Sequence, residues 1–368
     1  MKRKIVYGLV LTTLLVCTLR LAFNVKLLQA SGTIYIRADG SIDPPTPCIQ
    51  RGGNVYTFTC DIQDSIVVER DNIVIDGAGY TVQGAEVFDS KGINLSNRRN
   101  VTIRNMRIST FYYAIYFANS SRNNVFGNEI TNNDRGIVLK WYEAASYESS
   151  NHNSLSGNNI TNNWSGIIID HGYNNNVTSN IIANNDFTGI WLDWSFNNNI
   201  SKNIITSREF GIKLIYAKNN IVCRNTIKNN NIGFHTWWHG ESHLEYDKNK
   251  LYGNNFINNT QQVDIYSDPS GYADFWDNGY PSGGNYYSNY VGADDFWGIN
   301  QDLKGRDLIG DTPYVIDENN QDNYPLMIPW RECKPPVTEF PDINGDGEVN
   351  IKDLFIVATH FGEEFQNP

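Results

Sequence analysis

Basic residues are scarce in this 368-residue chain, which has 29 Lys and Arg against 40 Asp and Glu. The net charge of −11 and the pI near 5.0 exclude a nucleic-acid-binding protein, which needs a basic face, and argue against binding to an anionic membrane surface. Long apolar runs are also scarce, because residues 5–17 form the only one. An acidic chain with 13% aromatic residues suits an extracellular protein that meets neutral sugars, cations or other proteins.

Cysteine and methionine are equally sparse. Five cysteines are too few for a disulfide scaffold, and the absence of a Cys-x-x-Cys motif argues against a thiolate metal site. Cys48 and Cys60 are close enough to pair in an oxidising compartment, whereas Cys223 and Cys333 are expected to stay unpaired. With three Met and no cluster of sulfur ligands, the sequence gives no support for copper.

The N-terminus has the features of a targeting segment. Residues 1–4 are positively charged, residues 5–17 are apolar, and Ala30 offers a small residue before a cleavage site, which predicts a signal peptide over residues 1–30. The alternative is a retained membrane anchor, but the apolar run is short for a span and Arg20 interrupts its extension. We expect no membrane span after cleavage.

A four-residue pattern, Gly-Ile-x-Leu, recurs through the middle of the chain. Successive copies start 22 or 23 residues apart, except for one step of 30 that contains an insertion. A fixed period of this length indicates a solenoid, in which each repeat stacks on its neighbours. The copies begin at Gly92, Ala114, Gly136, Gly166, Gly189, Gly211 and Gly233, and a degraded copy lies near 263–265.

Each period holds three short β-rich stretches separated by Asn, Ser and Gly, as at 124–126, 129–131 and 136–139. Strands this short are unstable alone, but they gain hydrogen bonds when coils stack about 4.8 Å apart. The sequence therefore predicts an all-β fold, a right-handed parallel β-helix with about 22 residues per coil and three flat sheets.

Two columns of asparagine support the same register. Asn tolerates left-handed turns, and its amide can bond to a copy one coil away, so we expect structural ladders rather than ligand sites. Arg208 interrupts the second column. The first column contains Asn128, Asn158, Asn180, Asn203, Asn225 and Asn254, and the second contains Asn133, Asn163, Asn185, Asn230 and Asn259.

The coil sequence NNVFGNEITNNDRGIVL resembles NosD-type β-helix repeats, which are also grouped as carbohydrate-binding and sugar-hydrolysis (CASH) domains. Residues 64–84 resemble the first coil of such proteins, and residues 276–327 resemble the closing segment of archaeal members. The likeness spans roughly residues 33–330. It implies the β-helix fold and a secreted or periplasmic location, but leaves activity open, because the same fold carries lyases, hydrolases, epimerases and adhesins.

The flanking segments differ from the repeat. Residues 31–65 are expected to cap the exposed strand edges at one end of the 66–267 repeat region, and residues 268–330, rich in Tyr, Trp, Gly and Asp, to cap the other end. Residues 331–341 contain three prolines and predict a short stiff linker.

Residues 342–368 begin with a calcium-loop pattern. Oxygen ligands fall at positions 1, 3, 5, 9 and 12, and a Gly at position 6 permits the sharp turn. The loop resembles one dockerin segment, whereas family dockerins carry two. The resemblance implies calcium as the cofactor and a cohesin-like or other cell-surface protein as a partner. The expected ligands are Asp342, Asn344, Asp346, Asn350 and Asp353, with the backbone carbonyl of Glu348.

Alternation along the Gly-Ile-x-Leu stretch points to a paired-carboxylate site. If Ile and Leu point inward, the residues between and after them point outward, and Asp170 and Asp193 lie on neighbouring coils roughly 5 Å apart. Such a pair can supply the acid and the base or nucleophile of sugar cleavage. A solvated Asp ladder or a weak cation site is the structural alternative, and a one-residue slip would turn the pair inward. The surrounding candidates are His171, Trp191, Lys213 and His235.

Two insertions, 140–151 and 236–248, follow the same point of the coil and place aromatic residues near this pair. Those aromatics either bind a sugar or pack the insertions onto the coil. His235, His239 and His243 are four apart, but they fall on a strand and a loop rather than on a helix, so we do not expect a metal site. The candidate sugar-binding rings are Trp141, Trp191, Trp194, Trp237 and Trp238.

Three functions remain open from the sequence. The first is a secreted or cell-surface protein that binds polysaccharide or another surface component, tethered or stabilised by the calcium loop. The second is a polysaccharide lyase or glycoside hydrolase with the paired Asp site. The third is a structural or adhesin-like surface protein.

Overall fold

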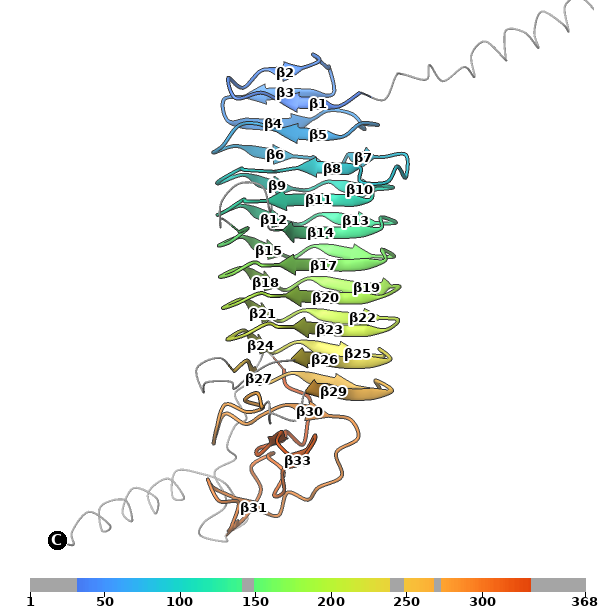
Figure 1. The fold of residues 1–368 in the computed structure, drawn as a ribbon. Coiled ribbons are helices and arrows are strands. Elements are labelled where there is room, and N and C mark those ends of the chain that lie inside the picture. The colour runs from blue at the N-terminus through green and yellow to red at the C-terminus, as the bar shows by residue number, and fades with distance from the viewer. Residues whose placement is uncertain (1–31, 141–148, 239–247, 268–272, 332–368) are drawn as a thin grey trace, which may run out of the picture. The chain divides into compact units, whose positions relative to one another are not determined.

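The computed structural model describes residues 32–140, 149–238, 248–267 and 273–331. The chain forms two units, Met1–Thr33 and Ile34–Pro368, and every described strand lies in the second. All but the last four of these strands form three long, mostly parallel sheets that wind as a right-handed parallel β-helix (Figure 1). The described residues contain no helix that could cross a membrane.

Sheet A has 11 strands, sheet B has 10 and sheet C has 9. Sheet A contains β1 (Ile34–Ile36), β2 (Ile42–Asp43), β5 (Ile66–Val68), β8 (Lys91–Asn94), β11 (Tyr113–Ala118), β14 (Arg135–Lys140), β17 (Ser165–Asp170), β20 (Thr188–Asp193), β23 (Phe210–Ile215), β26 (Ile232–Trp238) and β29 (Gln261–Ser267). Sheet B contains β3 (Ile49–Gly52), β4 (Val55–Phe58), β6 (Val74–Asp76), β9 (Thr102–Arg104), β12 (Asn124–Phe126), β15 (Ser154–Ser156), β18 (Asn176–Thr178), β21 (Asn199–Ser201), β24 (Ile221–Cys223) and β27 (Lys250–Tyr252). Sheet C contains β7 (Thr81–Gln83), β10 (Arg107–Ser109), β13 (Glu129–Thr131), β16 (Asn159–Thr161), β19 (Ile181–Asn185), β22 (Ile204–Ser207), β25 (Thr226–Lys228), β28 (Asn255–Ile257) and β30 (Tyr286–Tyr287).

The core is a set of aliphatic columns, one residue per coil, because each strand turns alternate side chains inward. In sheet B the column is fully buried over Val125, Leu155, Val177, Ile200, Val222 and Leu251. The glycine of the recurring pattern has a steric cause. A Cβ on Gly136 would lie 2.4 Å from the carbonyl oxygen of Gly166 on the next coil, so a side chain there would force the coils apart.

Asparagine ladders close the turns, as the sequence predicts. Each ladder Asn accepts hydrogen bonds from the backbone N–H and the side-chain amide of its counterpart one coil before, so buried polar groups are satisfied along the stack. A third ladder, at the turn between sheets A and B, went unnoticed in the sequence and contains Asn123, Asn153, Asn175, Asn198, Asn220 and Asn249. The interruption assigned to Arg208 is wrong by one residue, because Ser207 pairs with Asn185 and takes the ladder position.

Two of the ladders end on an aspartate. Asn249 donates to Asp274, and the backbone N–H of Asn285 donates to Asp322 at 2.6 Å. Aspartate suits the end of a ladder, because its oxygens accept hydrogen bonds and it has no side-chain amide that needs a further ladder member as acceptor. Asp322 is fully buried and also accepts the backbone N–H of Tyr324.

The buried Asp322 predicts a pH-dependent stability. Burial raises its pKa from 3.8 to about 8 and outweighs the hydrogen bonds from Asn285 and Tyr324, which lower it. The folded protein therefore keeps a proton that the unfolded chain releases above about pH 4, and stability falls as pH rises through the window from about 4 to about 8. Urea unfolding across this window should show a loss on the order of a few kcal/mol. Asp322→Asn should flatten that slope, and an unchanged slope would contradict this assignment.

Both ends of the stack are closed by chain that leaves the regular coil. At the N-terminal end β2 pairs antiparallel with β1, and the predicted disulfide joins Cys48 to Cys60. Disulfides of this kind persist in oxidising compartments. At the other end Trp276 packs edge-on against Phe234 at 5.7 Å, which covers the last coils. The short antiparallel pairs β31 (Phe296–Trp297) with β32 (Leu303–Lys304) and β33 (Tyr314–Val315) with β34 (Gln321–Asp322) follow.

Candidate functional site

The outer face of sheet A carries the residues singled out in the sequence, and the predicted register is confirmed. Asp170 of β17 pairs with Asp193 of β20, and the neighbouring column places Trp191, Lys213 and His235 on consecutive strands. His171 follows Asp170 directly. The face therefore brings together two carboxyls, an amine, an indole and two imidazoles.

The two carboxyl groups have different surroundings. The Nδ1 atom of His171 lies 2.6 Å from Oδ1 of Asp170. Burial, and then the charge of Asp170, raises the pKa of Asp193, although His171, Lys213 and the N–H of Trp194 oppose the shift. Oδ1 of Asp193 is buried without a hydrogen-bond partner among the described residues. The raised pKa favours the protonated form of Asp193, which suits a proton donor.

Lys213 and His235 are also perturbed. The Nζ atom of Lys213 lies 4.7 Å from the ring centroid of Phe210, 5.1 Å from that of Phe187 and 5.2 Å from that of Trp191. Burial lowers the pKa of Lys213, and Asp193 opposes the shift. Burial also lowers the pKa of His235, although its hydrogen bond to Asp264 at 2.7 Å opposes the shift. Both groups are therefore biased toward their neutral forms.

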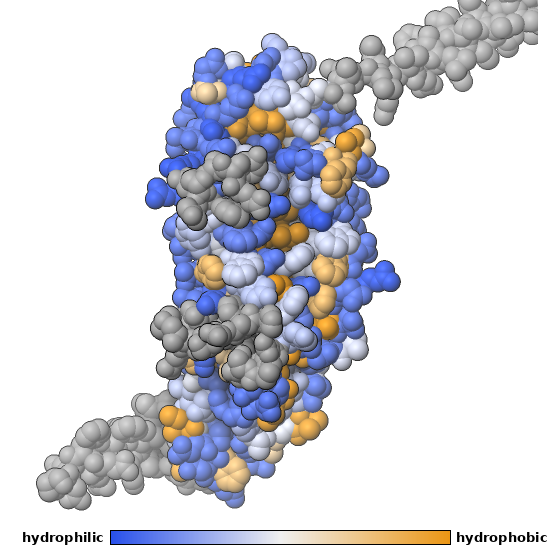
Figure 2. Space-filling model, in the orientation of Figure 1, coloured by the Kyte–Doolittle hydropathy of each residue, from blue (hydrophilic) through white to orange (hydrophobic). Residues whose placement is uncertain are grey.

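An exposed row of rings runs beside the Asp pair, where the chain leaves sheet A. We call His171, Trp194, Tyr216, Trp237 and Tyr266 the aromatic row. Neighbouring ring centroids lie 6.0, 4.5, 6.2 and 5.9 Å apart in that order. The side chains of Trp194, Trp237 and Tyr266 are 45%, 40% and 62% exposed, and Figure 2 shows less polar side chains gathered along this face of the stack.

Three members of the row have an unusual backbone. His171, Trp194 and Tyr216 have φ values of 54°, 44° and 48°, in the left-handed region that bulky residues rarely adopt. Earlier coils place asparagine there, at Asn97 and Asn119. Replacing the favourable residue by large rings costs of order 1 kcal/mol or more at each position, and strain of this kind concentrates at functional sites.

The other aromatic residues predicted to bind sugar lie outside the aromatic row or beyond the described residues. Trp191 lies on the face itself, half-buried, and its Nε1 is buried without a described partner. Trp238 ends β26, but its side chain lies outside the described residues, as does the whole of Trp141. Sequence reasoning missed Tyr216 and Tyr266, although aligning each coil one residue past the Asp column would have found Tyr216.

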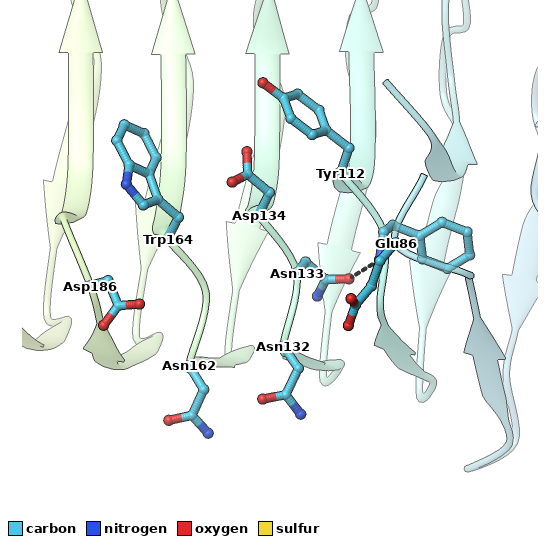
Figure 3. Close-up of a pocket in the computed structure, with 9 residues that line it drawn as sticks. Glu86, Tyr112, Asn132, Asn133, Asp134, Asn162, Trp164 and Asp186 are labelled. Carbon is cyan, nitrogen blue, oxygen red and sulfur yellow. Dashed lines mark hydrogen bonds between the residues drawn. The ribbon is translucent and has the colours of Figure 1, made fainter. Parts of the chain in front are cut away.

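A hollow lies at the opposite edge of sheet A, where the chain arrives from sheet C. It has a volume of about 380 Å³, within the usual size range of ligand pockets. Figure 3 shows Tyr112, Asp134 and Trp164 side by side on successive coils, with Glu86 and Asp186 toward the two ends. The guanidinium of Arg135 sits 4.6 Å from the ring of Tyr112 and 5.0 Å from that of Trp164. Phe111, Asn132, Asn133 and Asn162 complete the lining.

The predicted calcium ligands, Asp342 to Asp353, lie outside the described residues, and so do His239 and His243. Within the described ranges no three His, Cys, Asp or Glu side chains come together as metal ligands would. Calcium binding therefore stays a prediction from the sequence.

Comparison with known proteins identifies the family. The profile described as periplasmic copper-binding protein (NosD) matches residues 72–292, and no curated protein matches the chain. A solved mutant of the periplasmic alginate epimerase AlgG is 16% identical over 65% of this chain and 72% of its own, with a TM-score of 0.47. The A-module of the Azotobacter vinelandii mannuronan C-5 epimerase AlgE6 is 12% identical over 65% and 91%, with a TM-score of 0.34. The DFA-IIIase from Arthrobacter chlorophenolicus A6, without its lid, is 12% identical over 60% and 63%, with a TM-score of 0.36.

The copper in the family's description does not fit the described residues. Copper sites draw on grouped imidazole and sulfur ligands. Here Met106 and Cys223 are buried apart from each other in the stack. His171 and His235 lie on different coils, where His171 contacts Asp170 and His235 contacts Asp264. We therefore derive no chemistry through copper. Because the family profile covers 72–292, more than half of the 368 residues, the chain belongs to the NosD family of parallel β-helix proteins.

Proposed function

We propose that this protein binds a polysaccharide along the outer face of sheet A. The observation that carries the proposal is the aromatic row, in which exposed rings follow one another at the spacing of the coils. Ring edges and faces offer apolar surface to the C–H groups of a sugar, and the flanking Asp170 and Asp193 offer acceptors to its hydroxyls. A row that crosses five strands suits an extended chain better than a single small molecule.

The backbone strain supports binding over simple packing. Asparagine would satisfy the same turn without strain, as it does at Asn97 and Asn119. Rings kept at strained positions, partly exposed at His171 and Tyr216 and exposed at Trp194, therefore suggest selection for surface contact rather than for stability. If the rings only stabilised the coil, burying them would serve better than leaving Trp194 45% exposed.

The test is retention of the full mature chain by a panel of immobilised polysaccharides. We expect at least one glycan to retard the protein in affinity electrophoresis. If the protein migrates without retardation in gels that contain each glycan, the result would favour the structural or adhesin-like role instead.

A second candidate is cleavage of the bound chain, favoured by the paired Asp170 and Asp193. Asp193, with its raised pKa, would give its proton to the leaving oxygen, and Asp170 would act as base or nucleophile. Incubation with each retained glycan should then release reducing or unsaturated ends. Asp193→Asn should abolish that release while leaving retention within about threefold, because only the proton donor is lost. Retention without any new chain ends would mean that the protein binds the glycan and does not cleave it.

We further propose a secreted or cell-surface protein with a calcium-binding, dockerin-like segment at 342–368, which tethers it to a cohesin-like or other surface partner. The supports are the ligand spacing in the sequence, the Cys48–Cys60 disulfide and the periplasmic description of the family. Calorimetric titration of the full chain with calcium should show one saturable site, which Asp342→Ala with Asp346→Ala removes. If calcium binding by the double variant released as much heat as binding by wild-type protein, these residues would not be the calcium ligands.

A further inference from the structure

The hollow at the sheet C edge is strongly acidic. Glu86, Asp134 and Asp186 line it, whereas the adjoining cation, Arg135, forms an ion pair with Asp134. In the described part of the chain no cation pairs with Glu86 or Asp186. Both of these side chains are exposed, so their charges act on whatever enters the hollow.

The remaining lining suits a sugar. The partly exposed rings of Tyr112 and Trp164 provide apolar edges, and the exposed amides of Asn132 and Asn162 can both donate and accept hydrogen bonds. Carboxylates accept hydrogen bonds from neighbouring hydroxyls but repel a carboxylate on a ligand. The same abundance of hydrogen-bond acceptors recurs beside the aromatic row, where Asp170 and Asp193 lie next to a single amine, Lys213.

We infer that the hollow is a second contact for the polysaccharide and that it makes the protein select neutral, hydroxyl-rich glycans and reject polyuronates. This inference rests on the proposed function and narrows its ligand class. The hollow spans the coils of β8 to β20 at one edge of sheet A, and the aromatic row spans those of β17 to β29 at the other. A ligand that uses both contacts crosses the sheet obliquely over Asp193 and Trp191.

The experiment compares one glycan with and without charge. A neutral polysaccharide that retains the full chain is oxidised at C6, so that the same backbone carries uronates, and both forms are used in affinity electrophoresis. Wild-type protein should bind the neutral form at least about tenfold better at low ionic strength, because two uncompensated charges within a few ångströms of a ligand charge are worth about 1.4 kcal/mol. The preference should shrink in high salt.

Substitutions test whether Glu86 and Asp186 cause the preference for the neutral glycan. Glu86→Gln with Asp186→Asn should raise affinity for the oxidised form about tenfold and leave the neutral form within about threefold. The control, Asp302→Asn with Glu318→Gln, makes the same charge change at exposed sites of the C-terminal segment and should alter neither. Trp164→Ala should weaken binding of the neutral form.

The outcomes separate this inference from the proposed function. Equal binding of both forms, a preference for the oxidised form, or a preference that survives Glu86→Gln with Asp186→Asn would overturn the inference. In each of these cases the proposed function stands if the aromatic row still governs retention. Absence of binding to every neutral glycan, with retention by a polyuronate, also overturns the inference alone, whereas no retention at all overturns both.

Discussion

Replacing Asn203 with alanine should destabilise the protein by about 2–4 kcal/mol, because a buried ladder loses its middle member. Oδ1 of Asn203 accepts the backbone N–H and the side-chain amide of Asn180, both at 3.0 Å. Its own Nδ2 donates to Asn225 and to the carbonyl of Val177. Alanine would leave the N–H of Asn180 and the carbonyl of Val177 short of partners inside the stack, where water cannot replace them.

The measurement is urea unfolding of the full chain followed by circular dichroism. The matched control is Asn159→Ala on the outer face of sheet C, where the Asn side chain is exposed, and it should change stability by no more than about 0.5 kcal/mol. If the two variants unfold alike, the ladders do not stabilise the coil in the way described here.

Trp194→Asn should weaken glycan binding about tenfold or more while leaving stability nearly unchanged. The substitution removes the exposed ring of the aromatic row that directly follows Asp193, and aromatic contacts of this kind contribute about 0.5–1.5 kcal/mol each. It also relieves the strain at a φ of 44°, which asparagine adopts readily. The lost stacking on Tyr216 and the relieved strain are of similar size, so they offset each other in the free energy of unfolding.

Thermal unfolding and affinity electrophoresis of the same preparation check both halves of this expectation. Ile204→Asn is a useful comparison, because it removes an exposed apolar side chain from sheet C and should leave glycan retention at the wild-type level. A Trp194→Asn protein that unfolds several kcal/mol more easily would show that the row is chiefly a stabilising stack.

The repeat determined how much could be predicted. A period of 22 residues and the alternation of inward and outward positions sufficed for three sheets, and placed Asp170 opposite Asp193. The break in the second asparagine column was misplaced because the pairing of β19 with β22 shifts register between Ile182 and Asn185, which puts Ser207 where the period suggested Arg208. The third ladder was missed because most of its members lie next to other asparagines, as Asn123 does beside Asn124, so the column does not stand out in the sequence.

Only part of the proposed binding surface could be predicted from the sequence. The Asp pair and Trp194 follow from the columns, but the stacking of Trp194 on Tyr216 depends on a left-handed turn that no periodicity specifies. The hollow was missed altogether. Its lining comes from turn residues of successive coils together with Glu86, which belongs to a longer turn before the regular repeat begins. Such a site needs the turns to be placed in space.

The central claim is that the aromatic row holds a polysaccharide, and the most direct test is a glycan panel applied to wild-type protein and to Trp194→Asn with Tyr216→Asn side by side. Wild-type protein should be retained by at least one glycan, and the folded double variant should pass through unretarded. Retention of the double variant at wild-type strength would contradict the account, because the glycan would then be held by some other surface.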